Sequence, residues 1–118
     1  MPHLAPSPDR TLIGKVVYSS YTYRSSTRNT FYVIVRETAS SVWLKRMESI
    51  RTGLDYTGQW GTEAPAPFEP SFLKMGEENL LRAKKHSPSG PGDRLYFACG
   101  REAFFLWDGK PLKYDDRD

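Results

Sequence analysis

Few side chains in this chain of 118 residues could act as a general base. Histidine is the commonest general base in enzymes, and the sequence has two, His3 and His86. His3 lies in a proline-rich segment, and His86 borders a Ser-Pro-Ser-Gly-Pro-Gly stretch that is typical of a mobile loop. A general base needs rigid support from its surroundings, so we expect both histidines to be exposed and non-catalytic.

The remaining reactive groups are one thiol and a group of carboxylates. Cys99 precedes a glycine and an arginine, and a neighbouring cation favours the reactive thiolate; however, a free cysteine at a strand end usually acts as a small hydrophobic residue. Asp115, Asp116 and Asp118 lie at the C-terminus, where chains usually fray. The sequence contains no Gly-x-Ser-x-Gly elbow, phosphate loop or His-Glu-x-x-His motif. We therefore expect a non-enzymatic protein with no cofactor and no metal ion.

The elements that would position a binding surface are short strands. Residues 31–36 alternate between two faces, as a β-strand does, and residues 41–47 alternate again after a short turn. Residues 13–20 are rich in β-branched and aromatic side chains, which favours a further strand there. With residues 24–30 as the first loop, the sequence predicts a meander of three antiparallel strands.

The second half of the chain is interrupted by glycine and proline. Residues 52–76 contain a breaker in every candidate run, which predicts a long loop whose aromatic residues pack back on the body in places. Three further strands are predicted, at residues 80–85, 94–98 and 103–107.

Together these patterns predict an all-β protein, a small antiparallel barrel of the SH3-like or OB-like type with five to six strands. The barrel domain is expected to span residues 12–111, between a flexible arm at 1–11 and an acidic tail at 112–118. No stretch approaches the roughly 20 apolar residues that cross a bilayer, and the first ten residues do not resemble a secretory signal. With one cysteine, the composition favours a soluble protein of a reducing, cytoplasmic compartment.

The charge distribution indicates a nucleic-acid partner. From Arg10 to Arg51 the chain has eight basic residues against Glu37 and Glu48, and aromatic residues lie between them. Outward aromatic rings between cations can stack on unpaired bases of RNA or single-stranded DNA, at about 1–3 kcal/mol per base. The residues expected to bind phosphates are Arg24, Arg28, Lys45 and Arg46, and those expected to stack on bases are Tyr21, Tyr23 and Trp43. The alternative is that the rings fill the core and the cations only aid solubility.

Four short segments resemble an uncharacterised family of proteins encoded on bacteriophages and plasmids. The segments are Gly14-Lys15-Val16-Val17-Tyr18-Ser19-Ser20-Tyr21, Phe31-Tyr32-Val33, Ser41-Val42-Trp43-Leu44 and Leu106-Trp107-Asp108-Gly109-Lys110-Pro111. The resemblance implies a gene on a mobile element and transfers no functional residue. Small proteins of that origin often bind host nucleic acid or disable a host defence enzyme, in this case in the host cytoplasm.

The resemblance favours a second hypothesis, an inhibitor or adaptor that binds a host protein or defence complex. Trp, Tyr and Arg dominate binding hot spots. The residues expected at such an interface are Tyr56, Trp60, Phe68 and Trp107. The acidic tail would imitate nucleic acid towards a host enzyme. On sequence alone, this protein-binding hypothesis ranks slightly ahead of the nucleic-acid hypothesis.

Overall fold

The fold consists of short antiparallel strands. The computed structural model describes residues 12–23, 26–54, 60–74, 80–86 and 94–115. Within these ranges the regular elements are nine strands and one short 3-10 helix, Pro70–Leu73. The strands are β1 (Val16–Tyr23), β2 (Ser26–Glu37), β3 (Ser41–Met47), β4 (Ser49–Leu54), β5 (Trp60–Pro65), β6 (Leu81–His86), β7 (Tyr96–Cys99), β8 (Glu102–Leu106) and β9 (Leu112–Asp115).

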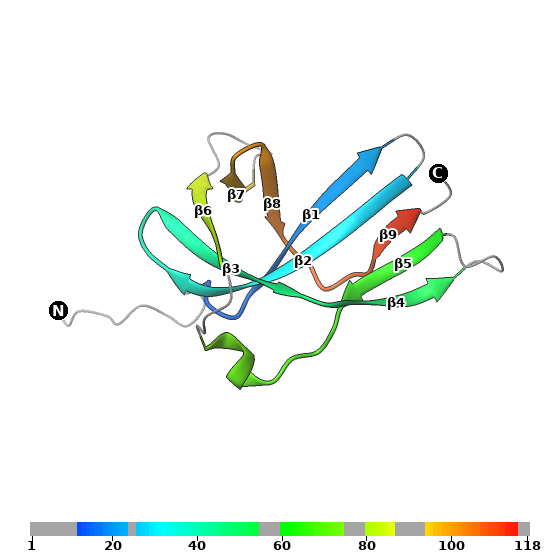
Figure 1. The fold of residues 1–118 in the computed structure, drawn as a ribbon, viewed down its shortest axis with the longest axis horizontal. Coiled ribbons are helices and arrows are strands. Elements are labelled where there is room, and N and C mark those ends of the chain that lie inside the picture. Colours follow the sequence, from blue (N-terminus) through cyan, green and yellow to red (C-terminus); the bar gives the residue numbers. More distant parts are fainter. Residues whose placement is uncertain (1–11, 24–25, 55–59, 75–79, 87–93, 116–118) are drawn as a thin grey trace.

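Six of these strands close into a barrel (Figure 1). The order β1-β8-β7-β6-β3-β2 returns to its start because β1 pairs with both β8 and β2, and all of these pairings are antiparallel. The prediction of an all-β fold built on a small antiparallel barrel is therefore confirmed. Closure leaves these strands without open edges where they pair around the barrel.

The barrel carries an extension made of β9, β5 and β4, which begins at the start of β2 (Figure 1). Thr27 of β2 pairs with Asp115 of β9, β9 pairs with β5, and β5 pairs with β4. Asn29 ties these strands together: its side-chain Nδ2 donates to Glu63 Oε1 at 2.9 Å and to the Lys113 carbonyl at 2.7 Å. Glu63 is buried and also accepts the backbone N–H of Asn29, so its carboxylate is satisfied where β2 meets the extension.

The extension corrects two sequence predictions. Strand β5 lies inside residues 52–76, which the breakers mark as a loop, and β9 occupies residues 112–115 of the predicted acidic tail. Strand β5 pairs on both sides, with β4 and β9, and this pairing outweighs its unfavourable local composition. Its proline stands at the strand end, Pro65, where a missing N–H costs little.

The first hairpin also differs from the prediction. Strand β1 begins at Val16, because residues 12–15 form a turn in which the Lys15 N–H donates to the Leu12 carbonyl and Gly14 has a φ of 90°. Strand β2 begins at Ser26, so most of the predicted loop at 24–30 is paired with β1 instead. The hairpin is therefore longer than local sequence indicates, and it reaches beyond the barrel to meet the extension.

Two apolar clusters lie on opposite faces of β2 and β3. The cluster inside the barrel comprises Val17, Tyr32, Ile34, Val42, Leu44, Ala83, Phe97 and Phe104. The outer cluster is centred on Phe31, Val33, Val35 and Met47. Because successive side chains of a strand point to opposite faces, one pair of strands serves both clusters. Each fully buried Phe contributes on the order of 1.5–3 kcal/mol.

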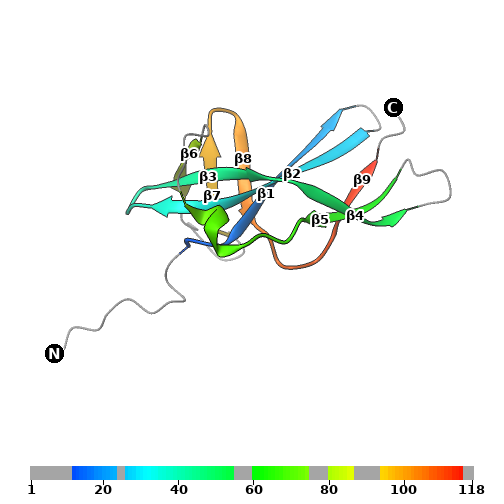
Figure 2. The ribbon, with the colours of Figure 1, turned by 60° about the horizontal axis from the view of Figure 1, so that its bottom comes forward.

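A segment between β5 and β6 covers the outer cluster. We call residues 66–74 the strap; they run back from the extension to the barrel and contain the 3-10 helix (Figures 1 and 2). Phe68, Phe72 and Leu73 of the strap pack on the outer cluster. The prediction that the aromatic residues of this region pack on the body is confirmed for Phe68 and Phe72, whereas the side chain of Trp60 lies outside the described residues.

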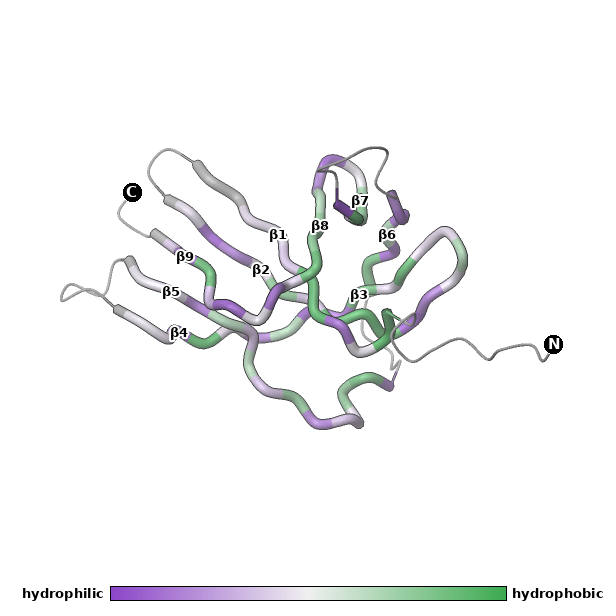
Figure 3. Tube along the Cα trace, turned by 180° about the vertical axis from the view of Figure 1, so that it is seen from behind, coloured by the Kyte–Doolittle hydropathy of each residue, from purple (hydrophilic) through white to green (hydrophobic). Residues whose placement is uncertain are grey.

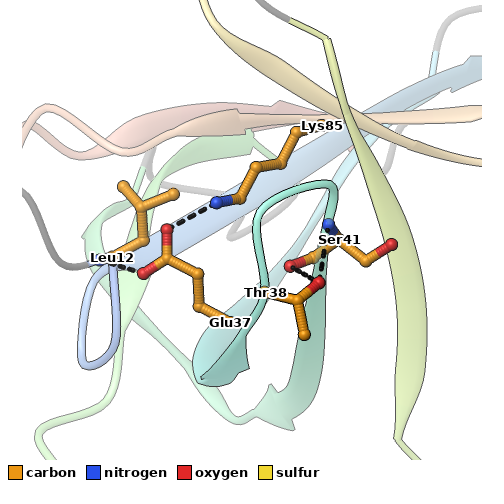
Figure 4. Close-up of polar contacts among 5 residues, drawn as sticks. All are labelled: Leu12, Glu37, Thr38, Ser41 and Lys85. Atoms are coloured by element: carbon orange, nitrogen blue, oxygen red, sulfur yellow. Dashed lines mark hydrogen bonds and ion pairs between the residues drawn. The ribbon is translucent and has the colours of Figure 1, made fainter.

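A partly buried ion pair joins β2 and β6 (Figure 4). Lys85 Nζ lies 2.6 Å from Glu37 Oε2, and each side chain is 17% exposed. Glu37 Oε1 also accepts the backbone N–H of Leu12 at 2.9 Å. The carboxylate thereby joins β2, β6 and the segment that leads into β1.

Candidate nucleic-acid interface

An aromatic row crosses four neighbouring strands on the outside of the barrel. Its members are His86 of β6, Tyr96 of β7, Phe105 of β8 and Tyr18 of β1, and each is the register partner of the next. His86 and Tyr96 stack with ring centroids 4.7 Å apart and planes 7° apart. Tyr96 and Tyr18 each lie 6.0 Å from Phe105, at interplanar angles of 37° and 43°. We call these four residues the aromatic row.

The alternation of the strands places this row outside. Val17, Phe97 and Phe104 are adjacent in sequence to members of the row and are fully buried in the barrel. Their neighbours must point the other way, and all four members of the row are only half-buried. Strand β8 is therefore hydrophobic over most of its length (Figure 3), because it contributes side chains both to the barrel interior and to the aromatic row. Cross-strand aromatic pairs of this kind contribute about 0.5–1.5 kcal/mol each, so the row is held in place by its own contacts.

Cations flank the aromatic row. The Arg94 guanidinium carbon lies 4.0 Å from the centroid of the Phe105 ring. Arg94 and Arg101 are both exposed, and both line a hollow of about 730 Å³ between β1 and β8. Tyr18 and Phe105 supply ring surface to the same hollow. This arrangement combines positive charge with apolar ring faces, which is the composition of sites for unpaired bases and their phosphates.

A second row continues the basic surface on β2, β3 and β6. Arg36, Trp43 and Arg82 are register partners across these strands. The Arg36 and Arg82 guanidinium carbons lie 4.6 Å and 5.3 Å from the Trp43 ring centroid. Lys84 is exposed on β6 between Arg82 and His86, so the outer face of β6 alternates two cations with the end of the aromatic row. The two rows meet on the outer face of β6.

The residues predicted to bind nucleic acid lie in different parts of the molecule. Trp43 lies on the outer wall, and Arg46 is exposed on β3. Lys45 is engaged by the strap: its Nζ donates to the Phe72 carbonyl at 3.0 Å and lies 4.1 Å from the centre of that ring. Arg28 is exposed on β2, in the hairpin beyond the barrel.

For the other three predicted nucleic-acid residues the structure gives only partial information. Tyr21 and Tyr23 belong to β1, but their side chains lie outside the described residues, as does the whole of Arg24.

The residues predicted to bind a protein are partly engaged in the outer cluster. Phe68 lies 5.8 Å from Phe72, and Trp107 meets Phe31 edge to face at 6.2 Å. Trp107 Nε1 also donates to the Lys110 carbonyl at 2.7 Å. Both side chains therefore hold the strap and the β8–β9 connection against the barrel. Tyr56 and the side chain of Trp60 lie outside the described residues.

Sequence reasoning missed the aromatic row and Arg94 as a single surface. Tyr18 and Tyr96 are recognisable as aromatic residues among cations, but only the register of β6, β7, β8 and β1 brings them into line with His86 and Phe105. His86, which borders a predicted loop, is the last residue of β6. The sequence shows which residues of a strand share a face, but which of the two faces points outward is known only once the buried residues are known.

Tyr32 is a titratable residue of the barrel interior. Burial raises the pKa of Tyr32 above its ordinary value of 10.0, and the carboxylate of Glu102 adds to the effect. The Tyr32 ring packs edge to face on Phe104 at 5.2 Å. In the described part of the chain, no three His, Cys, Asp or Glu side chains are grouped so that they could hold a metal ion.

Comparison with known proteins adds no relatives. The chain matches no known family, and no curated protein sequence and no solved structure is significantly similar to it. Among the described residues, no helix has the length and apolar character needed to cross a membrane. The fold and the outer wall of the barrel are thus the basis on which a function can be proposed.

Proposed function

We propose that this protein binds unpaired nucleic acid, RNA or single-stranded DNA, on the outer wall of its barrel. The observation that carries the proposal is the aromatic row, with the Arg94 guanidinium 4.0 Å from the centre of the Phe105 ring. Bases would stack on the ring faces, and Arg94, Arg101 and Lys84 would neutralise phosphates.

The geometry of the rings favours single strands over duplex. Tyr96 and Tyr18 lie 6.0 Å from Phe105 at tilts of 37° and 43°, so these rings do not cover one another's faces. Because Arg94 lies over the Phe105 ring, we place the stacked bases on Tyr18 and Tyr96. Bases in a duplex are already stacked and paired, and their faces are not accessible to such a surface. Each stacked base would add about 1–3 kcal/mol of binding free energy, with little dependence on sequence.

A fluorescence anisotropy titration with labelled oligothymidylate and oligouridylate at low and moderate salt tests the proposal. We expect binding by the wild type and a steep loss of affinity with salt. We also expect weaker binding by Tyr96→Ala and by Arg94→Ala. Lys113→Ala is a matched control for Arg94→Ala, because it removes one positive charge from an exposed position on β9, in the extension. Absence of binding at low salt, or equal effects of Arg94→Ala and Lys113→Ala, would contradict the proposal.

A second candidate function is the binding of a host protein by a product of a phage or other mobile element, as the sequence resemblance implies. The open edge of the extension favours it. Strand β4 pairs only with β5 among the described residues, and Ile50 on it is 46% exposed. Exposed strand edges can bind an extended segment of a partner by strand addition.

Affinity pull-down from a bacterial host lysate tests this second candidate. Support would be a defined complex that survives nuclease treatment and is lost in the variant Ile50→Lys. Recovery of host proteins only when nucleic acid is intact would instead favour the first function.

A further inference from the structure

The second row, on the outer faces of β2, β3 and β6, is not used by the proposed stacking of bases on the aromatic row. Arg36 and Arg82 flank Trp43 through the strand register, and their guanidinium carbons lie 4.6 Å and 5.3 Å from the centre of its ring. The two carbons are therefore separated by at most the sum of these distances, about 10 Å. At this separation, small side-chain rotations let both guanidiniums donate to a single phosphate group.

The two arginines of this row are not neutralised by a carboxylate. Both side chains are exposed, and among the described residues no carboxylate lies within ion-pair distance of either one. Glu37 follows Arg36 in the sequence but points to the other face of β2. Its register partner Val42 is fully buried in the barrel, and its carboxylate binds Lys85. The row thus presents two positive charges in a form that suits an anion with several acceptor oxygens.

Trp43 holds the two guanidiniums near each other. Its ring is half-buried because it packs on the outer cluster. Contacts between a guanidinium and the face of an indole are favourable, and they restrict the rotamers of both arginines before a ligand arrives. A site whose side chains are already restricted loses less conformational entropy when it binds.

The second row also lies where the open part of the outer wall ends. From the aromatic row, the exposed face of β6 leads through Lys84 to Arg82 and then to Trp43 on β3. Two residues beyond Trp43 on the same face, Lys45 donates to a carbonyl of the strap, and the strap covers the outer cluster there. In the opposite direction along β3, the turn at residues 38–40 ends the sheet. A single strand that follows this face must end or leave the surface at the second row.

We propose that the second row binds the terminal phosphate of a single strand that lies on the aromatic row; the inference rests on the nucleic-acid-binding function proposed above. A phosphate monoester carries about 1.5 to 2 negative charges at pH 7 and three acceptor oxygens. A phosphodiester inside the strand carries one charge and two free oxygens. Two uncompensated guanidiniums match the monoester better, so the protein selects strands with a phosphorylated end.

The test uses three oligothymidylates of one length: unphosphorylated, with a 5′-phosphate, and with a 3′-phosphate. Each competes, unlabelled, with a labelled oligothymidylate for the wild type at one fixed salt concentration, and fluorescence anisotropy gives its affinity. We expect one of the two phosphorylated oligomers to bind about tenfold more tightly than the unphosphorylated one, because it gains charge-assisted hydrogen bonds. The end that produces this gain also gives the direction of the strand on the wall.

The variants Arg36→Gln and Arg82→Gln separate the row from the overall charge of the protein. Each removes one guanidinium from an exposed position, and we expect the gain to fall to about twofold or less in either variant. Lys113→Gln is the matched control, because it removes one exposed positive charge from β9 in the extension and should leave the gain in place. Trp43→Leu should also lower the gain; a loss of folding alone would weaken binding of all three oligomers together and leave their ratio unchanged.

The outcomes distinguish this inference from the function on which it rests. If the wild type binds all three oligomers equally, nucleic-acid binding stands and the terminal-phosphate site is overturned. If Lys113→Gln reduces the gain as much as Arg36→Gln does, the phosphate responds only to overall charge, and the site is again overturned. If the wild type binds none of the three at low salt, both the site and the proposed function are overturned.

Discussion

The ion pair between Glu37 and Lys85 predicts a specific pattern of stability in two single variants and one double variant. In Lys85→Met, Glu37 keeps its bond from the Leu12 N–H but loses a partner at 2.6 Å. Pairs that are fully buried cost about 3–5 kcal/mol when one partner is removed, and fully exposed pairs contribute about 0–1 kcal/mol. With both side chains 17% exposed, and with the Leu12 N–H still donating to the carboxylate, we expect Lys85→Met to lower the free energy of unfolding by about 2–3 kcal/mol.

The double variant Glu37→Gln with Lys85→Met should be less destabilised than Lys85→Met alone. Glutamine keeps an acceptor for the Leu12 N–H and leaves no uncompensated charge, so the expected cost falls to about 1 kcal/mol. Lys84→Met is the matched control, because Lys84 is the exposed neighbour on β6 and its replacement should change stability by less than about 0.5 kcal/mol.

Urea denaturation followed by tryptophan fluorescence measures five proteins: the wild type, Lys85→Met, Glu37→Gln, the double variant and Lys84→Met. Linear extrapolation gives each free energy of unfolding. The reasoning would be refuted if Lys85→Met cost no more than Lys84→Met. It would also be refuted if the double variant lost at least the sum of the two single effects, because the pair would then carry no coupling.

Three further predictions concern pH, salt and the strap. Because the pKa of Tyr32 is raised, its stabilising contribution is fully present below pH 10 and is lost as the pH rises through the raised value; the wild type should lose stability above pH 10 more steeply than Tyr32→Phe in urea titrations, and equal slopes would contradict this. Arg94→Ala should reduce the slope of log affinity against log salt for oligothymidylate by about 0.7, the value of one phosphate contact on a single strand; an unchanged slope would remove Arg94 from the interface. Phe72→Ala, which removes a half-buried ring of the strap, should cost about 2 kcal/mol and speed amide exchange in β2 and β3 while leaving oligothymidylate affinity unchanged; a parallel loss of affinity would show that the strap shapes the binding wall.

Much of the barrel could be predicted because its strands alternate strongly. Residues 41–47 were expected as a strand and form β3, and the predicted strands at 80–85, 94–98 and 103–107 correspond to β6, β7 and β8 within two residues at each end. In β3 the buried Val42 and Leu44 alternate with the half-buried Trp43 and Lys45, so the local pattern contains the structural information.

The extension could not be predicted from local composition. Strand β5 contains Gly61 and Pro65, and β9 lies in a stretch that reads as an acidic tail. Both exist because each has a partner strand far away in the sequence, and the buried carboxylate of Glu63 is satisfied only when Asn29 of β2 lies beside it. Such long-range pairing leaves no periodic signal in the strand itself.

The candidate site was predictable in kind but not in place. Cations interleaved with aromatic residues indicate stacking and phosphate binding, and Trp43 does lie on the outer wall between two arginines. Lys45 lies on the expected face of β3, but its Nζ donates to the Phe72 carbonyl of the strap. This contact cannot be predicted from the sequence. The aromatic row could not be predicted without the register of four strands, because its members are separated in the sequence and are brought together only by strand pairing.

The most direct test of the central claim is a two-dimensional NMR titration of the labelled protein with oligothymidylate at low salt. The account predicts that the amide signals of Tyr18, Lys84, His86, Tyr96 and Phe105 shift progressively, while those of β4, β5 and β9 remain in place. Shifts confined to the extension, or no shifts at all, would contradict the claim that the outer wall of the barrel binds unpaired nucleic acid.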